Sequence, residues 1–234
     1  MCFSADISLG AAVVLLPVGG YCAAAAAYKD RAYLPLAITP LLFGAQQLGE
    51  AVVWFGLERG DPDLVRDGSR WFLLFALAVW PAWVPVAAAA IEPPGARRWA
   101  FRAVTAVGLV LGCVYYLPLV VGSALADPRV VGHSLRYDFA AVPAVRVAPG
   151  WVWPTVYLVA VCDPLLASRD HRLRPLGALV AVTAAVAYAA FRDAFASVWC
   201  FLAAALSVYL AYALYRLPDP SPGYPRTPGA RPAL

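Results

Sequence analysis

The segment WFLLFALAVWPAWVPVAAAAI, residues 71–91, contains no charged side chain. A helix that crosses a bilayer needs about 20 consecutive apolar residues, so this segment has the length and composition of one membrane span. Six further stretches of the chain have the same character. We therefore predict an all-α fold, an integral membrane bundle of seven transmembrane helices, at residues 7–28, 33–57, 71–91, 101–125, 151–168, 175–191 and 195–217.

The composition of the whole chain agrees with this fold. Of its 234 residues, 62% are hydrophobic and 14% are charged, and the mean hydropathy is +0.70. Ordinary globular domains have about 45–50% apolar and about 25% charged residues. So few charges exclude a soluble enzyme, a disordered protein and a disulfide-stapled secreted domain. The net charge of +4 is scattered over short loops, which argues against a nucleic-acid partner.

The predicted membrane domain comprises residues 1–217. Its sixth span is short and Ala-rich, and only Arg192 and Asp193 separate it from the seventh, so we expect a tight hairpin there. The longest connection is the loop 127–150, in which the alternating stretch SLRYDFA (134–140) predicts a short strand pair or a cap over the outer face. Residues 218–234 contain six prolines and are predicted to form a disordered cytoplasmic tail.

The distribution of basic residues predicts the orientation of the bundle. Eleven of the 18 Lys and Arg residues fall on one side of the predicted spans, and most acidic residues fall on the other. Cytoplasmic loops are enriched in Lys and Arg, so we expect the amino terminus outside and the carboxyl terminus in the cytoplasm. No basic stretch precedes the first span, which is therefore expected to be retained. We expect the membrane to be the plasma membrane of a bacterium, and a single lysine among abundant Arg, Ala, Val and Pro suggests a high-GC genome.

Proline and glycine mark expected features of the helices. The first five spans contain prolines whose freed carbonyls need new donors in lipid, whereas the interiors of the last two contain none. We expect the first five helices to be kinked and the last two to be straighter. Gly108 and Gly112 form a Gly-xxx-Gly pair, which predicts close approach of another helix.

Glu50 is the main candidate for a functional group inside the membrane, where ionisable residues are costly. Helical spacing places Glu50 on one stripe with Phe43, Gln46, Gln47 and Trp54. The first and seventh helices begin at the same side of the membrane, and both bring polar residues there. We therefore predict a ligand-binding cluster at the outer ends of helices one, two and seven, formed by Gln46, Gln47, Glu50, Trp54, Ser197, Trp199 and Cys200.

Four interpretations of this cluster remain open. In the first, the cluster is a pocket for a small molecule, a lipid headgroup or an ion. In the second, Glu50 carries protons along a conduction path. In the third, Glu50 is neutral and the cluster only fixes helix packing. The fourth is a membrane-embedded hydrolase or transferase with Cys2 as nucleophile, His133 as base and Glu50 as acid. An assembly subunit without a ligand also fits the chain. Neither the reaction nor the oligomeric state follows from the sequence.

Other polar residues have simpler interpretations. Asp163, beside Pro164, is predicted to be a second buried acid at a local kink, and Arg192 and Asp193 are predicted to form a loop ion pair. The cysteines have no zinc or iron–sulfur spacing, so we predict no metal and no cofactor. Cys2 and Cys200 are both placed at the outer side, where a disulfide could join them.

Three segments carry a resemblance to a known family. MCFSA at residues 1–5, LLFGAQQLGE at 41–50 followed by Val53 and Trp54, and SVWCF at 197–201 resemble the signatures of a family of uncharacterised bacterial membrane proteins that open with Met-Cys-Phe-Ser-Ala. The resemblance implies a retained amino terminus and a multi-helix membrane protein. It transfers no catalytic role, but it selects the same three segments that the predicted topology brings together.

Overall fold

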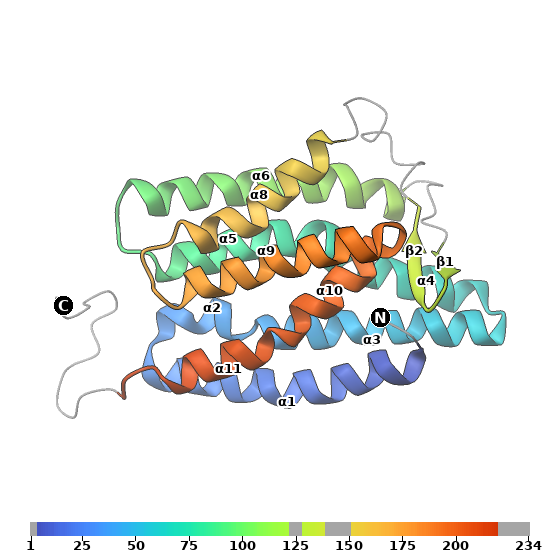
Figure 1. The fold of residues 1–234 in the computed structure, drawn as a ribbon, viewed down its shortest axis with the longest axis horizontal. Coiled ribbons are helices and arrows are strands. Elements are labelled where there is room, and N and C mark those ends of the chain that lie inside the picture. The colour runs from blue at the N-terminus through green and yellow to red at the C-terminus, as the bar shows by residue number, and fades with distance from the viewer. Residues whose placement is uncertain (1–3, 122–127, 139–150, 220–234) are drawn as a thin grey trace.

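Seven helical rods lie side by side in the structure, a computed structural model that describes residues 4–121, 128–138 and 151–219 (Figure 1). The first four rods are α1 (Ala5–Lys29); η1 (Arg31–Tyr33) with α2 (Leu34–Ala37) and α3 (Thr39–Arg59); α4 (Pro62–Leu73) with η2 (Leu74–Val79) and α5 (Trp80–Ile91); and α6 (Ala96–Val121). The last three are α8 (Val152–Leu166); α9 (Leu173–Ala190); and η3 (Arg192–Ala194) with α10 (Phe195–Ala205) and α11 (Ser207–Tyr215).

These rods match the seven predicted spans in number and order. Six of them are long and apolar enough to cross a membrane. The exception is α8, which has 15 residues, whereas the sixth predicted span, expected to be the short one, forms the 18-residue α9. As predicted, α9 and the seventh rod form a hairpin, joined by the single turn η3. The tail 220–234 and most of the loop 127–150 lie outside the described residues.

The prolines interrupt the second and third rods in different ways. The second rod breaks at Ile38, between α2 and α3, with Pro35 and Pro40 on either side. The third rod widens into the π-helical segment η2 directly before Pro81. The seventh rod also breaks, at Leu206, although no proline lies near. The prediction of a straight seventh helix is therefore wrong. The Leu206 N–H bonds the Ala203 carbonyl three residues back, which tightens the last turn of α10 and bends the rod.

Small residues allow the closest helix contacts. On α6, a side-chain Cβ built at Gly108 would lie 2.0 Å from the carbonyl oxygen of Pro81, and one at Gly112 would lie 2.9 Å from Ala78. The predicted close approach at this glycine pair is thus observed, with the third rod as the partner. A similar contact joins α1 to α3, where Gly19 faces Leu41.

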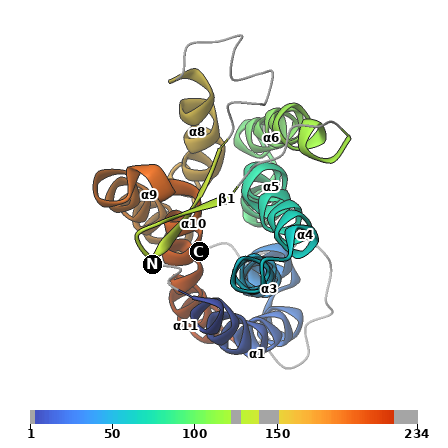
Figure 2. The same ribbon diagram turned by 90° about the vertical axis from the view of Figure 1, so that its right-hand side faces the viewer.

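A two-stranded antiparallel hairpin closes one end of the bundle (Figure 2). Its strands are β1 (Pro128–Val131) and β2 (Ser134–Tyr137), joined by Gly132, with φ of 61°, and His133. Leu135 is completely buried, so the short strand pair predicted for this loop is present and packs on the helices. We call this the hairpin end of the bundle, and we call the opposite end, where α1, α5, α8 and α11 finish, the tail end.

Two side-chain contacts attach the hairpin to the helices. The Tyr137 ring stacks on Phe72 of α4, with centroids 5.1 Å apart. Arg136 forms an ion pair with Asp193 of η3, at 3.4 Å. The prediction of an Arg192–Asp193 pair is wrong, because Asp193 bonds the hairpin while the Arg192 guanidinium lies over the Tyr188 ring.

Candidate functional site

The polar stripe on α3 faces the interior of the bundle. Gln46, Gln47 and Glu50 are completely buried, and Phe43 and Trp54 are each only 7% exposed. Because positions three and four apart share a helix face, one orientation of α3 buries all five side chains. The other rods that α3 mainly contacts are the first, through α1, the third, through α4, and the seventh, through α10.

Glu50 joins the second rod to the seventh. Its Oε1 accepts a hydrogen bond from the Ser197 hydroxyl of α10 at 2.6 Å, and its Oε2 accepts one from the Gln47 amide at 3.4 Å. Ser197 is itself completely buried. Two positions 147 residues apart in the chain therefore share one buried hydrogen bond, as the predicted clustering of helices two and seven requires.

Gln46 connects the same stripe to the third rod. Its Oε1 accepts a hydrogen bond from the Trp80 indole N–H at 2.8 Å, and the Trp80 ring stacks on Phe43 with centroids 4.0 Å apart. The amide of Gln46 also lies beside the Cys200 thiol of α10. The third rod was not part of the predicted cluster, and no feature of the sequence singled out Trp80.

Several buried polar atoms around Glu50 have unused hydrogen-bonding capacity. Within the described residues, four such atoms have no hydrogen-bond partner: Ser8 Oγ, Gln46 Nε2, Gln47 Oε1 and Trp54 Nε1. Ser8 belongs to the group because α1 and α3 run antiparallel, with Gly19 opposite Leu41 and Leu16 opposite Gly44. Extending this register brings Ser8 to the level between Glu50 and Trp54. We call these residues the Glu50 cluster: Ser8, Gln46, Gln47, Glu50, Trp54 and Ser197.

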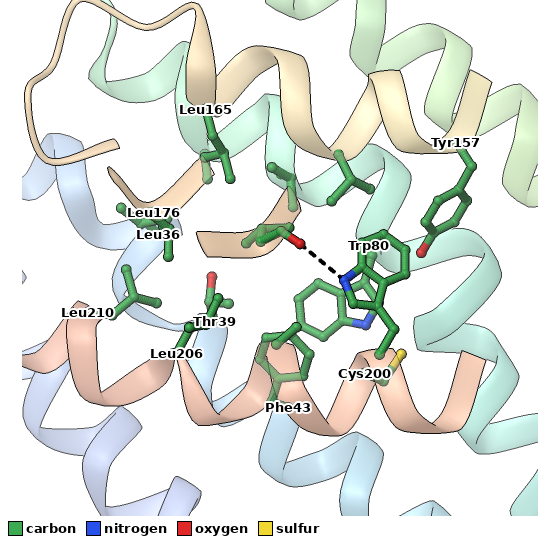
Figure 3. Close-up of a pocket in the computed structure, with 16 residues that line it drawn as sticks. Leu36, Thr39, Phe43, Trp80, Tyr157, Leu165, Leu176, Cys200, Leu206 and Leu210 are labelled. Atoms are coloured by element: carbon green, nitrogen blue, oxygen red, sulfur yellow. Dashed lines mark hydrogen bonds between the residues drawn. The ribbon is translucent and has the colours of Figure 1, made fainter. Parts of the chain in front are cut away.

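An apolar cavity of about 70 Å³ lies next to this cluster, inside the bundle (Figure 3). Side chains from the second, third, fifth, sixth and seventh rods line it, and nearly all of them are apolar. Phe43, Trp80 and Cys200 form its wall on the side of Gln46. The cavity and the polar cluster are therefore separated by one layer of side chains.

The hairpin covers the end of the bundle nearest the cluster. Leu135 and Tyr137 belong to the same packed group of side chains as Trp54, Phe72 and Cys200. Ala5, in the first turn of α1, also belongs to this group. Ser4 caps α1 by accepting a hydrogen bond from the Ile7 N–H at 3.4 Å. The predicted meeting of helices one, two and seven beneath the loop is thus present in the structure.

The structure separates some predicted site residues from Glu50. Trp199 is buried, but its indole N–H donates to the Val180 carbonyl of α9 at 3.4 Å, so it lines the cavity on the far side of α10 from Ser197. Cys200 is a buried free thiol. His133 lies at the exposed turn of the hairpin. Cys2, and with it the suggested nucleophile and disulfide partner, lies outside the described residues.

The second buried acid is Glu92, not Asp163. Asp163 is exposed on the surface of α8, whereas Glu92, at the tail end, is 3% exposed. Its Oε2 accepts hydrogen bonds from the Ser168 hydroxyl and the Arg169 N–H, both at 3.0 Å. Glu92 thus ties the end of α5 to the end of α8, which gives it a structural role. Glu92 follows the last apolar residue of a predicted span, so the sequence did not indicate that its side chain is buried.

Metal ligands do not gather near Glu50. In residues 4–121, 128–138 and 151–219 there is no group of three or more His, Cys, Asp and Glu side chains able to hold a metal ion. The donors that do surround the carboxyl group are amides, hydroxyls and an indole, which suit hydrogen bonding to a small molecule or to water.

The comparisons with known proteins concern the chain as a whole. A search of curated proteins and a search of solved structures found no match. A family of unknown function, DUF6629, matches residues 1–223, which include the Glu50 cluster, the hairpin and all seven rods. The chain therefore belongs to this family of unknown function, DUF6629.

Proposed function

We propose that this protein is an integral membrane protein of the bacterial plasma membrane that binds a small molecule at the Glu50 cluster. Its amino terminus lies outside and its carboxyl terminus in the cytoplasm. Six apolar helices of spanning length support membrane insertion, and the excess of Lys and Arg at the tail end supports the orientation. In this arrangement the Glu50 cluster lies toward the outer surface, beneath the hairpin.

The observation that carries the proposal is the set of four unpartnered polar atoms around a buried carboxyl group. Leaving a buried donor or acceptor unsatisfied costs about 1–3 kcal/mol for each group. A packing device would be expected to satisfy its own members, because a half-satisfied polar network is less stable than an apolar core. The spare donors and acceptors therefore favour an additional molecule as their partner.

The spare groups define the chemistry of that molecule. Trp54 Nε1 requires an acceptor, whereas Gln47 Oε1 requires a donor, so the ligand must carry both. A cationic group on the ligand would in addition be complementary to the Glu50 carboxyl group, which accepts hydrogen bonds from Ser197 and Gln47. The nearby cavity of about 70 Å³ lies behind Phe43, Trp80 and Cys200, so the ligand occupies only the space between the polar side chains. A small amine or hydroxyl compound fits there better than a lipid headgroup.

Native mass spectrometry of the gently purified protein tests the proposal. We expect the wild type to carry a bound small molecule that is absent from Glu50→Gln, because the amide cannot pair with a cationic group and adds a competing donor. Glu58→Gln is the matched control. Glu58 lies on the same helix and is exposed, so this variant should retain the ligand.

The thermal stability of the two variants separates a binding site from a packing role. If Glu50→Gln folds as stably as Glu58→Gln and has lost the ligand, Glu50 binds it. If no molecule accompanies the wild type while Glu50→Gln folds normally, the pocket does not exist. Loss of stability in Glu50→Gln without any bound molecule in the wild type assigns Glu50 to helix packing.

A further inference from the structure

A second hollow lies between α5 and the beginning of α6, at the tail end of the bundle. It has a volume of about 300 Å³, with an apolar wall on α5 formed by Val86, Ala89 and Ala90. The α6 wall consists of Arg98, Arg102 and Thr105. These three positions are four and three residues apart, so they follow one helix face over roughly 10 Å. We call this hollow the α5–α6 groove.

The two arginines of this groove have no acidic partner in the part of the chain that the structure describes. The nearest carboxylate in the sequence, Glu92, is occupied: it accepts from Ser168 and from the Arg169 N–H, and its ion pairs are with Arg97 at 3.8 Å and with Arg169 at 3.9 Å. The Nε of Arg98 is buried without a hydrogen-bond acceptor. Arg98 is half-buried and Arg102 is exposed, so an anion in the groove would supply the acceptor that the Arg98 Nε lacks and would remain within reach of both guanidinium groups.

Trp99 holds the second guanidinium in place. The Arg102 guanidinium lies over the Trp99 ring, 4.8 Å from its centroid, and stacking leaves the N–H groups at the guanidinium edge available for hydrogen bonds. Trp99 is 67% exposed. Exposed tryptophans near the ends of spanning helices sit at the level of the lipid headgroups, which places the groove at that level too.

We propose that the α5–α6 groove binds an anionic phospholipid, with its phosphate between Arg98 and Arg102 and an acyl chain along Val86 and Ala89. Arginine binds phosphate through paired N–H groups, and basic pockets between helices on the cytoplasmic side are suited to anionic headgroups. The combination of two unpaired cations with an apolar wall matches a lipid, which supplies both parts. The proposal rests on the membrane insertion proposed above but not on a ligand at Glu50.

Reconstitution into nanodiscs tests this site. The full-length protein is placed in nanodiscs of phosphatidylcholine with phosphatidylglycerol, and native mass spectrometry after partial release measures which lipid stays bound. We expect wild type to retain phosphatidylglycerol preferentially. One basic residue near the membrane surface contributes about 1 kcal/mol, so Arg98→Gln with Arg102→Gln should lower this preference by about fivefold per arginine, or about 30-fold for both.

Two matched variants complete the experiment. Arg31→Gln with Arg216→Gln removes the same charge from exposed positions at the same end and should lower the preference far less, because neither side chain lines the groove. Arg98→Lys with Arg102→Lys keeps the charge and should restore part of it. Equal retention of both lipids by wild type, or an equal loss in the Arg31 and Arg216 variant, would overturn the site. Recovery of the protein outside the membrane fraction would instead overturn membrane insertion.

Discussion

The Tyr157 hydroxyl replaces a backbone donor that Pro81 lacks. In the π-helical segment before Pro81, each N–H bonds the carbonyl five residues back, and the last such bond runs from Trp80 to Phe75. The next bond in this series would join residue 81 to Ala76, but proline has no N–H. Instead, the Tyr157 hydroxyl of α8 donates to the Ala76 carbonyl at 2.6 Å, so the third and fifth rods are joined at this point.

Tyr157→Phe should therefore destabilise the protein by about 1–3 kcal/mol, because it leaves the buried Ala76 carbonyl without a donor. The measurement is the free energy of unfolding in detergent by denaturant titration. Tyr21→Phe is the control, since Tyr21 is 48% exposed on α1, and it should be neutral. Equal stability of the two variants would mean that Ala76 finds another donor.

At this scale the sequence predicted some contacts and missed others. The α3 stripe was predictable because five positions share one helix face, and a single rotation of the helix buries them all. The exposure of Asp163 and the burial of Glu92 were not predictable, because neither residue belongs to a stripe of polar residues on one helix face. Whether such a residue faces inward depends on the rotation of its helix against neighbours far away in the chain. Trp80 was missed because its partner, Gln46, is on another rod.

Among the glycines of the described residues, Gly108 of α6 makes the tightest contact, against Pro81 of α5. Gly108 has no room for a side chain, because the Pro81 backbone occupies the position of a Cβ. A backbone carbonyl cannot rotate away as a side chain can, so a larger residue must separate the two helices.

Gly108→Ala is accordingly expected to lower the free energy of unfolding by about 1–3 kcal/mol, the usual range for overpacking. The thermal transition in detergent, compared with that of Gly20→Ala, tests this expectation. Gly20 has no atom within 4 Å of the built Cβ position, and alanine favours the helix, so that control should be neutral or stabilising. A stable Gly108→Ala protein would show that the helices separate at no cost.

The elements themselves were largely predictable, and their ends were less so. The seven apolar stretches correspond to the seven rods, because the length of an apolar stretch determines the length of the helix that it forms. The break at Leu206 could not be predicted, since no proline or charge lies near it, and the 15-residue α8 is shorter than the span 151–168 predicted for it. The hairpin was indicated by its alternating residues, whereas its attachment through Tyr137 and Arg136 depends on helices that precede and follow it.

For the molecule as a whole, the proposed orientation follows from charge. Within the described residues, nine Lys and Arg residues lie at the tail end and six at the hairpin end. A reporter fused after Leu234 should be active only when it is of a type that works in the cytoplasm. The same reporter inserted after Gly60, which is exposed at the hairpin end, should be inactive. If the reporter is inactive after Leu234 and active after Gly60, the protein has the opposite orientation in the membrane.

The short α8 has a consequence for the surrounding bilayer. Its 15 residues rise about 22 Å, compared with roughly 30 Å for the hydrocarbon core. The 25-residue α1 and the 26-residue α6 are long enough to exceed that thickness. The protein in its proposed setting therefore presents different hydrophobic thicknesses on different sides. The bilayer beside α8 must become thinner, whereas the bilayer beside α1 need not. Hydrophobic mismatch therefore distinguishes the face of the bundle that α8 occupies from the other faces.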